Sequence, residues 1–213
     1  MKGQNDAKKV SEAVIKRLPR YLRVFKDLIK RGVMNISSQK IAESMGVTAS
    51  QVRQDFCSFG GFGQQGYGYD VKKMTDELSQ ILGLDKSYNM VIFGAGNIGR
   101  ALANYRAFFD EGFVVKAMFD IAPQGGEING IPVLHTDCFA EFASRNAVDI
   151  AVITTPKDKA EKIAELVTAA GIKNIWNFAP VELKGAEGVI IENISMSDSL
   201  YVLSYKLNNR VKE

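Results

Sequence analysis

The chain has 213 residues, which is enough for two small domains with a core each. Residues 1–88 hold 15 Lys and Arg against 9 Asp and Glu, whereas residues 89–213 hold 12 against 15, so the first part is predicted to meet a polyanion. No apolar run approaches the roughly eighteen residues of a membrane span and no signal-peptide core is evident, so we expect a cytoplasmic protein.

Two helices are predicted at the start of the chain. Residues Lys8–Leu18 carry apolar side chains on one side, and Pro19 suits the first position of a second helix because its missing N–H would be unbonded there. The second helix, Pro19–Arg31, has one apolar face, and Gly32 supplies a left-handed stop. These helices would frame a first domain.

The next two helices have the spacing of a helix-turn-helix. A helix over Ser38–Met45 is followed by Gly46, which permits the positive φ of a tight turn, and by a fourth helix that starts at Thr48. Ala42 is small where the two helices approach each other, and Val52 packs back into the angle between them. An ordinary helical hairpin is the alternative, and the positive charge favours DNA binding over it.

The fourth helix presents polar side chains suited to a DNA groove. Val52 and Phe56 are four residues apart and face the core, and Thr48 caps the helix in a capping box with Gln51. Arg can pair with guanine and Gln with adenine through two hydrogen bonds each, whereas Ser can serve bases or phosphates. The predicted DNA contacts of this segment are Thr48, Ser50, Gln51, Arg53 and Gln54.

A glycine-rich segment over residues 60–69 is predicted to form a β-hairpin wing. Its tyrosines alternate with glycines, and a glycine-flanked tip lets the backbone approach a phosphate or enter a minor groove. A flexible linker is the alternative, which the aromatic alternation disfavours. The predicted DNA contacts of the wing are Gly63, Gln64, Gln65 and Tyr67.

A dinucleotide fingerprint follows a fifth helix, Val71–Leu82. The strand Asn89–Phe93 leads into a glycine loop and a helix over Asn97–Phe109, and the next strand, Phe113–Phe119, ends at Asp120. The glycines allow the tight turn, the approach of a pyrophosphate and close helix packing, while the acid accepts hydrogen bonds from ribose hydroxyls and repels a 2′-phosphate. We therefore predict NAD as the cofactor, bound by Asp120 and by Gly94, Ala95, Gly96, Asn97, Ile98 and Gly99.

Three more strands extend the predicted parallel sheet. They cover Ile131–Leu134, Ile150–Ile153 and Asn174–Trp176, and a helix over Lys157–Ala170 joins the last two. Loops at the carboxyl ends of parallel strands line the ligand crevice. These loops add Thr154, Thr155, Pro156, Asn177 and Phe178 to the predicted cofactor site.

The last helix is predicted to contact a second subunit. A strand over Gly188–Glu192 precedes a helix over Asp198–Asn209, which is apolar on more than one side. A surface helix is normally two-faced, so we expect this one to be buried against a partner subunit.

Catalysis is not expected. A nicotinamide dehydrogenase needs a proton donor or acceptor and a substrate domain, but His135 has no obvious acidic partner and the residues after the last strand are too few for such a domain. Two alternatives stay open. One is an NAD(H)-dependent oxidoreductase with a helical dimerisation domain, and the other is a constitutive DNA-binding protein whose second domain binds another nucleotide, such as AMP.

The cysteines argue against a metal centre. Cys57 and Cys138 are far apart and form no C-x-x-C or Cys/His cluster, so we expect neither zinc nor a disulfide framework. An ordinary, buried or partly buried thiol is the favoured interpretation of each, and a redox-active thiol is the alternative.

The order of these motifs resembles the Rex family of bacterial redox-sensing transcriptional repressors. The motifs are Val52-Arg53-Gln54-Asp55, a glycine–aromatic wing, the loop at 94–99, a Thr-Pro strand end and Asn177-Phe178-Ala179-Pro180. The resemblance covers the chain from about Ala13 to Leu207.

The resemblance implies a fold, an assembly and an activity. The fold is α/β, with a winged-helix DNA-binding domain over residues 1–84, a Rossmann NAD(H)-binding domain over 85–194 and a domain-swapped dimerisation helix over 195–213. The assembly is a homodimer on double-stranded, palindromic operator DNA. The activity is transcriptional repression by a protein that senses the NADH/NAD+ ratio and leaves the operator when NADH binds.

The resemblance also assigns single residues. Arg17 falls on a helix-end arginine implicated in domain coupling and is placed with the DNA site, and Tyr105 falls on a tyrosine of the first Rossmann helix near the nicotinamide. We expect the neutral ring of NADH to pack near the side chains Tyr105, Phe109, Thr155 and Phe178.

Three departures from the family pattern stand out. Gln54 replaces a common Lys, and Gln64 and Gln65 stand where the wing tip is usually basic, which leaves the operator preference open. Ser195 stands where the family usually has an Asp, and Asp198 is a candidate substitute.

Overall fold

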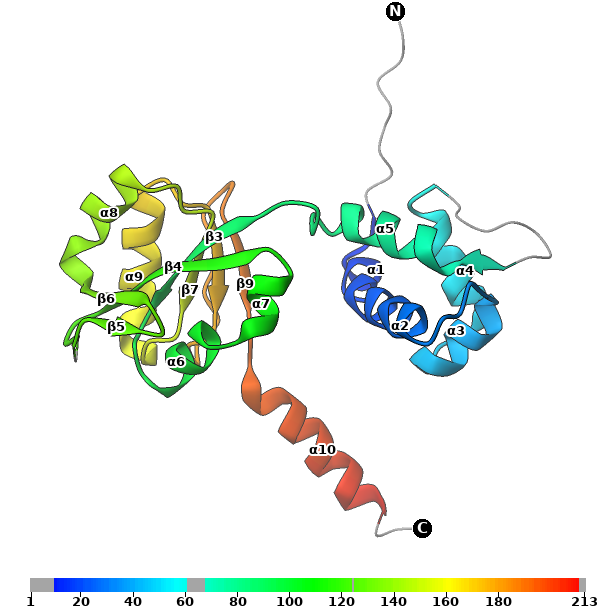
Figure 1. Ribbon diagram of the computed structural model, residues 1–213. Helices are drawn as coiled ribbons and strands as arrows, with labels where there is room; N and C mark the ends of the chain where they lie inside the picture. Colours follow the sequence, from blue (N-terminus) through cyan, green and yellow to red (C-terminus); the bar gives the residue numbers. More distant parts are fainter. Residues whose placement is uncertain (1–9, 61–67, 124, 211–213) are drawn as a thin grey trace, which may run out of the picture. The chain divides into compact units, whose positions relative to one another are not determined.

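The structure, a computed structural model, describes residues 10–60, 68–123 and 125–210 (Figure 1). It divides into two compact units, residues 1–86 and 87–213. The separate C-terminal segment expected over 195–213 falls within the second unit, so its role in dimerisation stays a prediction. In the described parts, no helix is long and apolar enough to span a membrane.

The first unit is a small helical domain with a two-stranded sheet. Its helices agree with the predicted ones except at the start, where the predicted helix over Lys8–Leu18 is reduced to one turn and the chain bends before Pro19. Residues 8 and 9 of that prediction lie outside the described residues. The elements are α1 (Glu12–Ile15), α2 (Leu18–Lys30), β1 (Asn35–Ile36), α3 (Ser38–Met45), α4 (Ala49–Cys57), β2 (Tyr69–Asp70) and α5 (Val71–Ile81).

The sheet of the first unit pairs the described end of the predicted wing with a strand that was not predicted. Tyr69 pairs antiparallel with Ile36, so the described end of the wing segment joins a strand that precedes the helix-turn-helix. Gly68 makes this pairing possible, because its φ is +77° and a Cβ there would lie 2.5 Å from the Ile36 carbonyl oxygen. The two-residue strand β1 is too short to give an alternating pattern. The predicted wing tip, residues 61–67, lies outside the described residues.

Aromatic side chains form the core of the first unit. The Tyr21 and Phe56 rings are 4.8 Å apart between centroids, and the Phe56 and Tyr69 rings are 5.0 Å apart. Phe25 also lies against Phe56 and is fully buried. The core therefore fixes α4 against α2 and against β2.

The second unit is a doubly wound α/β domain. Its seven-stranded sheet has the order β5-β6-β4-β3-β7-β8-β9, and all neighbours are parallel except β5 and β6. Helices α8 and α9 cover one face of the sheet, and α6 and α7 lie on the other (Figure 1). Each pair packs apolar side chains against its face of the sheet. The strands are β3 (Tyr88–Phe93), β4 (Phe113–Asp120), β5 (Glu127–Ile128), β6 (Ile131–His135), β7 (Ile150–Ile153), β8 (Asn174–Asn177) and β9 (Ile190–Asn193).

The helices of the second unit correct one prediction. The single helix expected over Asn97–Phe109 is two helices, because the backbone turns extended at Tyr105. The Tyr105 ring lies 4.7 Å from Phe108, which in turn lies 5.6 Å from Trp176 of the sheet, so aromatic packing replaces a continuous helix. The helical elements are α6 (Asn97–Ala103), α7 (Arg106–Asp110), η1 (Thr136–Cys138), α8 (Phe139–Arg145), α9 (Lys157–Ala169) and α10 (Met196–Arg210).

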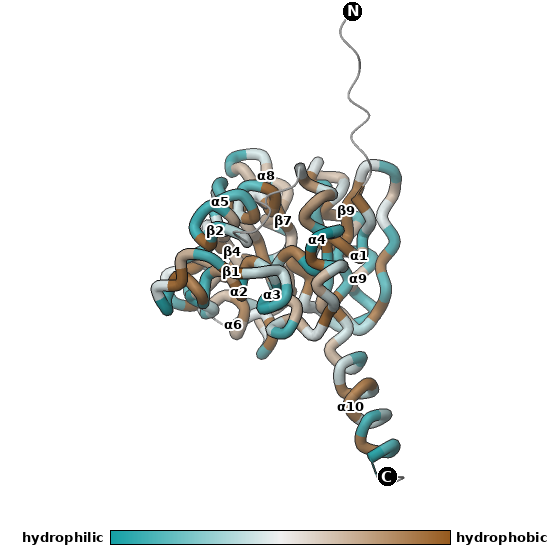
Figure 2. Tube along the Cα trace, turned by 90° about the vertical axis from the view of Figure 1, so that its right-hand side faces the viewer, coloured by the Kyte–Doolittle hydropathy of each residue, from teal (hydrophilic) through white to brown (hydrophobic). Residues whose placement is uncertain are grey.

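The last helix, α10, has an apolar surface without cover in the single chain. None of its residues is buried, and its large apolar side chains are between 51% and 72% exposed. Figure 2 shows hydrophobic segments recurring along its length. These side chains are Met196, Leu200, Tyr201, Val202, Leu203, Tyr205 and Leu207.

Candidate nucleic-acid interface and dinucleotide site

The helix-turn-helix is built from α3 and α4. Gly46 adopts the left-handed conformation, with a φ of 69°, and so allows the tight turn between the helices. The Thr48 hydroxyl accepts a hydrogen bond from the Gln51 backbone N–H at 3.1 Å and caps α4. The Gln51 side chain does not return this bond as a capping box would, because its amide turns to Asp55 instead.

The outer face of α4 carries the remaining predicted base-reading side chains. Ser50, Arg53 and Gln54 are exposed, and one Arg53 nitrogen donates to the Ser38 hydroxyl at 3.0 Å. Gly63, Gln64, Gln65 and Tyr67 lie outside the described residues. The structure therefore gathers the helix residues into one polar face, and the wing contacts stay predictions.

A buried carboxylate without a predicted role lies behind this face. Asp55 is fully buried. Its carboxylate accepts two hydrogen bonds from the Arg17 guanidinium at 2.7 and 2.8 Å, one from the Tyr21 hydroxyl at 2.8 Å and one from the Gln51 amide at 2.7 Å. We call these four residues the Asp55 cluster. Burial alone would raise the pKa of Asp55, but the bonds from Arg17, Gln51 and Tyr21 lower the pKa below its ordinary value.

The Asp55 cluster gives Arg17 a structural contact beside its predicted role in the DNA site. The guanidinium lies at the start of α2, is 23% exposed and binds both oxygens of Asp55. Sequence spacing could not reveal this pair, since the partners are 38 residues apart. Arg17 therefore connects the first helices to α4.

The dinucleotide loop is shaped by two glycines and open at a third. A Cβ on Gly94 would lie 2.7 Å from the Thr154 hydroxyl, and a Cβ on Gly99 would overlap the Gly94 carbonyl. A Cβ on Gly96 would meet nothing within 4 Å, so this residue faces open space at the start of α6. The loop therefore packs tightly below and leaves room above for a phosphate to approach Ala95, Asn97 and Ile98.

Asp120 ends β4 and is held beside the loop. Its carboxylate accepts hydrogen bonds from the backbone N–H of Ala95 at 2.7 Å and of Ala122 at 3.0 Å. Each carboxylate oxygen can accept about two hydrogen bonds, so both oxygens retain capacity for ribose hydroxyls. This arrangement suits a ribose whose 2′-hydroxyl carries no phosphate.

The loop after β7 contains one satisfied and one orphaned hydroxyl. The Thr154 hydroxyl lies 2.9 Å from the Phe93 carbonyl and 3.1 Å from the Gly94 carbonyl and so holds the glycine loop. The Thr155 hydroxyl is buried and has no hydrogen-bond partner in the described structure. Buried hydroxyls are normally paired, so this one is a candidate ligand contact. Pro156 follows as the N-cap of α9.

Asn177 stabilises the neighbouring loop. It is fully buried, and its amide nitrogen donates to the Val181 carbonyl at 2.7 Å and to the Asn193 side chain at 2.8 Å. Its amide oxygen accepts from Ala179 N–H at 3.0 Å. These bonds give Asn177 a structural contact network, and its cofactor contact stays a prediction.

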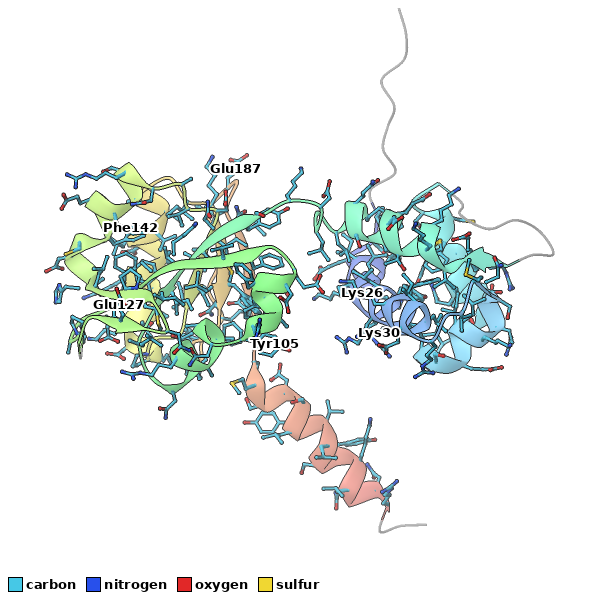
Figure 3. All side chains as sticks on the ribbon, in the orientation of Figure 1. Lys26, Lys30, Tyr105, Glu127, Phe142 and Glu187 are labelled. Carbon is cyan, nitrogen blue, oxygen red and sulfur yellow. The ribbon has the colours of Figure 1, made fainter. Side chains whose placement is uncertain are left out.

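A cleft of about 760 Å³ joins part of the predicted nicotinamide side to the start of α10. Ile98 and Phe178 line it, together with Ser195 and Asp198, whose side chains share a 2.6 Å hydrogen bond. Tyr105 and Phe109 do not line it. Tyr105 lies at the turn between α6 and α7 and is 57% exposed (Figure 3), and Phe109 is 68% exposed.

Two further predictions concern titratable side chains. His135 does have an acidic neighbour, since Asp137 lies 3.2 Å from its Nδ1, but both side chains are exposed. Cys57 and Cys138 are exposed, so the expectation of buried or partly buried thiols is wrong. Across the described ranges, no three His, Cys, Asp or Glu side chains gather as a metal site.

Comparisons with known families match both units. A family described as putative DNA-binding protein N-terminus matches residues 9–57, and one described as CoA binding domain matches residues 85–181. The chain is 52% identical to the redox-sensing transcriptional repressor Rex of Thermoanaerobacter pseudethanolicus, over 94% of this chain and 90% of that protein. It is 48% identical to Rex of Clostridioides difficile, over 93% and 95%.

The chain belongs to the Rex family. Solved structures of the Rex-family repressor RSP share its fold, with a TM-score of 0.88, 48% identity and coverage of 94% and 95% of the two chains. RSP in complex with β-NAD+ and operator DNA gives a TM-score of 0.89 at 50% identity, covering 94% of each chain. The predicted family and fold class are thus confirmed, and the Rex relatives are transcriptional repressors.

Proposed function

We propose that this protein is a homodimeric transcriptional repressor that senses the NADH/NAD+ ratio, binds a palindromic operator and leaves it when NADH binds. The observation that carries the proposal is the presence in one chain of a polar recognition helix and a dinucleotide loop, at 50% identity to RSP, a repressor solved with β-NAD+ and operator DNA. RSP has also been solved with β-NADH.

The second unit supplies the input site. Gly96 leaves room for the pyrophosphate at the start of α6, and the Asp120 oxygens lie beside the loop with capacity for the ribose hydroxyls. The orphaned Thr155 hydroxyl follows β7, and Phe178, which lines the cleft together with Ile98 of α6, follows the parallel neighbour β8, so both lie at the carboxyl edge of the sheet. Bound NAD(H) would supply a nicotinamide ring that is cationic when oxidised and neutral when reduced.

The first unit supplies the DNA reader. The N-terminal residues of a recognition helix contact base edges in the major groove, and α4 presents Ser50, Arg53 and Gln54 on its exposed face. Arg53 can donate two hydrogen bonds to guanine. The excess of Lys and Arg in residues 1–88 favours the approach of DNA.

The exposed helix α10 supports the homodimer. A helix whose large apolar side chains are more than half exposed is stabilised by burial, and a second copy offers the same helix in return. A dimer would place two copies of α4 on the two halves of a palindrome. NADH can release such a dimer from DNA only by binding the released state more tightly than the DNA-bound state.

The proposal includes the absence of catalysis and a place of action. The Rex relatives are named as repressors, so we propose that this chain binds NAD(H) without turning it over. Since its target is DNA, we propose that it acts in the cytoplasm.

Fluorescence anisotropy of a labelled operator duplex tests the proposal. We expect binding in the presence of NAD+ and release when NADH is titrated in, at equal saturation of the nucleotide site. Asp120→Ala should lower the affinity for both nucleotides and leave the DNA affinity of the apo-protein unchanged. Equal DNA affinity with the two saturating nucleotides would refute redox sensing, and turnover of a hydroxy compound abolished by one titratable residue would support an oxidoreductase instead.

A further inference from the structure

The carboxylate of Asp55 is saturated with hydrogen bonds. Its Oδ1 accepts from Arg17 Nη2 at 2.8 Å and from Gln51 Nε2 at 2.7 Å. Its Oδ2 accepts from Arg17 Nε at 2.7 Å and from the Tyr21 hydroxyl at 2.8 Å. An ionised carboxylate has about four acceptor positions, and four donors occupy them. Asp55 is therefore fixed in one rotamer on the buried side of α4.

This fixed carboxylate determines how Gln51 is oriented. An ionised carboxylate only accepts hydrogen bonds, so the amide nitrogen of Gln51 must face Asp55 and its Oε1 must face away. The backbone N–H of Gln51 is held as well, by the Thr48 hydroxyl at 3.1 Å. Both ends of the residue are thus constrained in the single chain, and its rotamer freedom is lost before DNA arrives.

The groups of Gln51 that remain free match one base. After one N–H is given to Asp55, the amide retains a second N–H and the Oε1 acceptor. Adenine offers the complementary N7 acceptor and N6 donor in the major groove. Gln51 is the third residue of α4, in the part of a recognition helix that meets base edges. Ser50, Arg53 and Gln54 have no such contact to Asp55 among the hydrogen bonds of the described residues.

We propose that Asp55 is a positioning residue that pre-orients Gln51 to read an adenine in each operator half-site. The inference rests on the proposed operator binding and deepens it, because it separates the side chain that contacts the base from the buried side chain that sets its direction. A merely structural Asp55 would need only Arg17 and Tyr21. In that case the loss of its carboxylate would weaken binding to all sequences equally.

The test is a selection from palindromic DNA duplexes with randomised half-sites, using the full chain saturated with NAD+, followed by sequencing. Wild type is expected to prefer adenine at one half-site position. Gln51→Met, which keeps the length of the side chain without its amide, should reduce that preference by about 5- to 150-fold, the range of a bidentate amide–base contact, and leave the position read by Arg53 unchanged.

Asp55→Asn should reduce the preference at the same position, and adding it to Gln51→Met should cause no further loss there. Tyr21→Phe is the matched control, because it removes one donor to the same carboxylate but leaves the Gln51 contact. It should keep the adenine preference. If circular dichroism shows that Asp55→Asn does not fold, Gln51→Glu replaces it as the test. The new carboxylate is repelled by Asp55 and turns outward, so the base preference should move from adenine toward cytosine.

Any of three results would overturn the inference while wild type still selects a palindrome and releases it with NADH. The first is an unchanged base preference in Gln51→Met, and the second is an equal loss at all positions in Asp55→Asn. The third, where Gln51→Glu is used, is an unchanged preference in that variant. A wild-type protein that selects no sequence would instead refute the proposed function, and the inference would fall with it.

Discussion

The two candidate sites are held in place by different physical means. The proposed recognition helix α4 is fixed by a buried ionic cluster, in which the Asp55 carboxylate accepts hydrogen bonds from Arg17, Tyr21 and Gln51. The dinucleotide loop is fixed by steric fit, because Gly94 and Gly99 leave no room for a side chain. An ionic cluster is sensitive to the loss of any partner, whereas a glycine loop is sensitive to the addition of atoms. Substitutions at the first site should therefore unfold the helix, whereas substitutions at the second should distort the loop that binds the dinucleotide.

The largest effect is expected from removing the arginine of the Asp55 cluster. Arg17→Met leaves a buried carboxylate without its charged partner, and breaking such a pair costs about 3–5 kcal/mol. Hydrogen exchange of the α2 and α4 amides, with and without denaturant, measures the loss in the first unit. Arg23→Met, at an exposed position of the same helix, is the control and should change stability by less than about 0.5 kcal/mol. Equal exchange in the two variants would show that the cluster does not hold α4.

The glycine loop should separate stability from binding. Gly99→Ala inserts a methyl group where the Gly94 carbonyl lies, and such overpacking costs about 1–3 kcal/mol. The methyl group added by Gly96→Ala meets nothing within 4 Å, so this variant should keep nearly the stability of wild type. It should weaken the binding of NADH, because the methyl group fills the space for the pyrophosphate. Thermal unfolding monitored by Trp176 fluorescence and calorimetric titration with NADH measure the two effects. A Gly96→Ala variant that binds NADH with unchanged affinity would place the pyrophosphate elsewhere.

Arg53→Ala should affect recognition without affecting either scaffold. The side chain is exposed, and its hydrogen bond to Ser38 is a surface contact. We expect specific operator binding to weaken by about 1–3 kcal/mol, with a smaller loss on unrelated DNA. Anisotropy titrations on both duplexes test this, with NADH affinity as the control. An equal loss on both duplexes would mean that Arg53 contacts phosphates only.

Features of the two sites differ in how far the sequence predicts them. Local features were correct where local physics decides them: α3 over Ser38–Met45 and the left-handed Gly46 follow from spacing and from the needs of a tight turn. The Asp55 cluster was missed because Arg17 is 38 residues from Asp55, and nothing in α4 alone distinguishes a buried Asp from an exposed one. The break before α7 was missed because it depends on Phe108 packing against Trp176, a contact between distant segments.

The smallest expected effect is a pH dependence of the first unit. The folded pKa of Asp55 lies below its ordinary value of 3.8, so around pH 4 the unfolded chain binds more protons than the folded one. The stabilisation is therefore fully present above the unfolded pKa and is lost as the pH falls through the folded pKa. Hydrogen exchange of the α4 amides at decreasing pH should show this loss of stability. Asp55→Asn should flatten the dependence of the unfolding free energy on pH. Glu12→Gln is the control, because Lys16 also lowers the pKa of Glu12 but this pair is exposed to solvent, where screening makes it weak. A slope that survives in Asp55→Asn and disappears in Glu12→Gln would assign the acid sensitivity to the surface pair instead of the buried cluster.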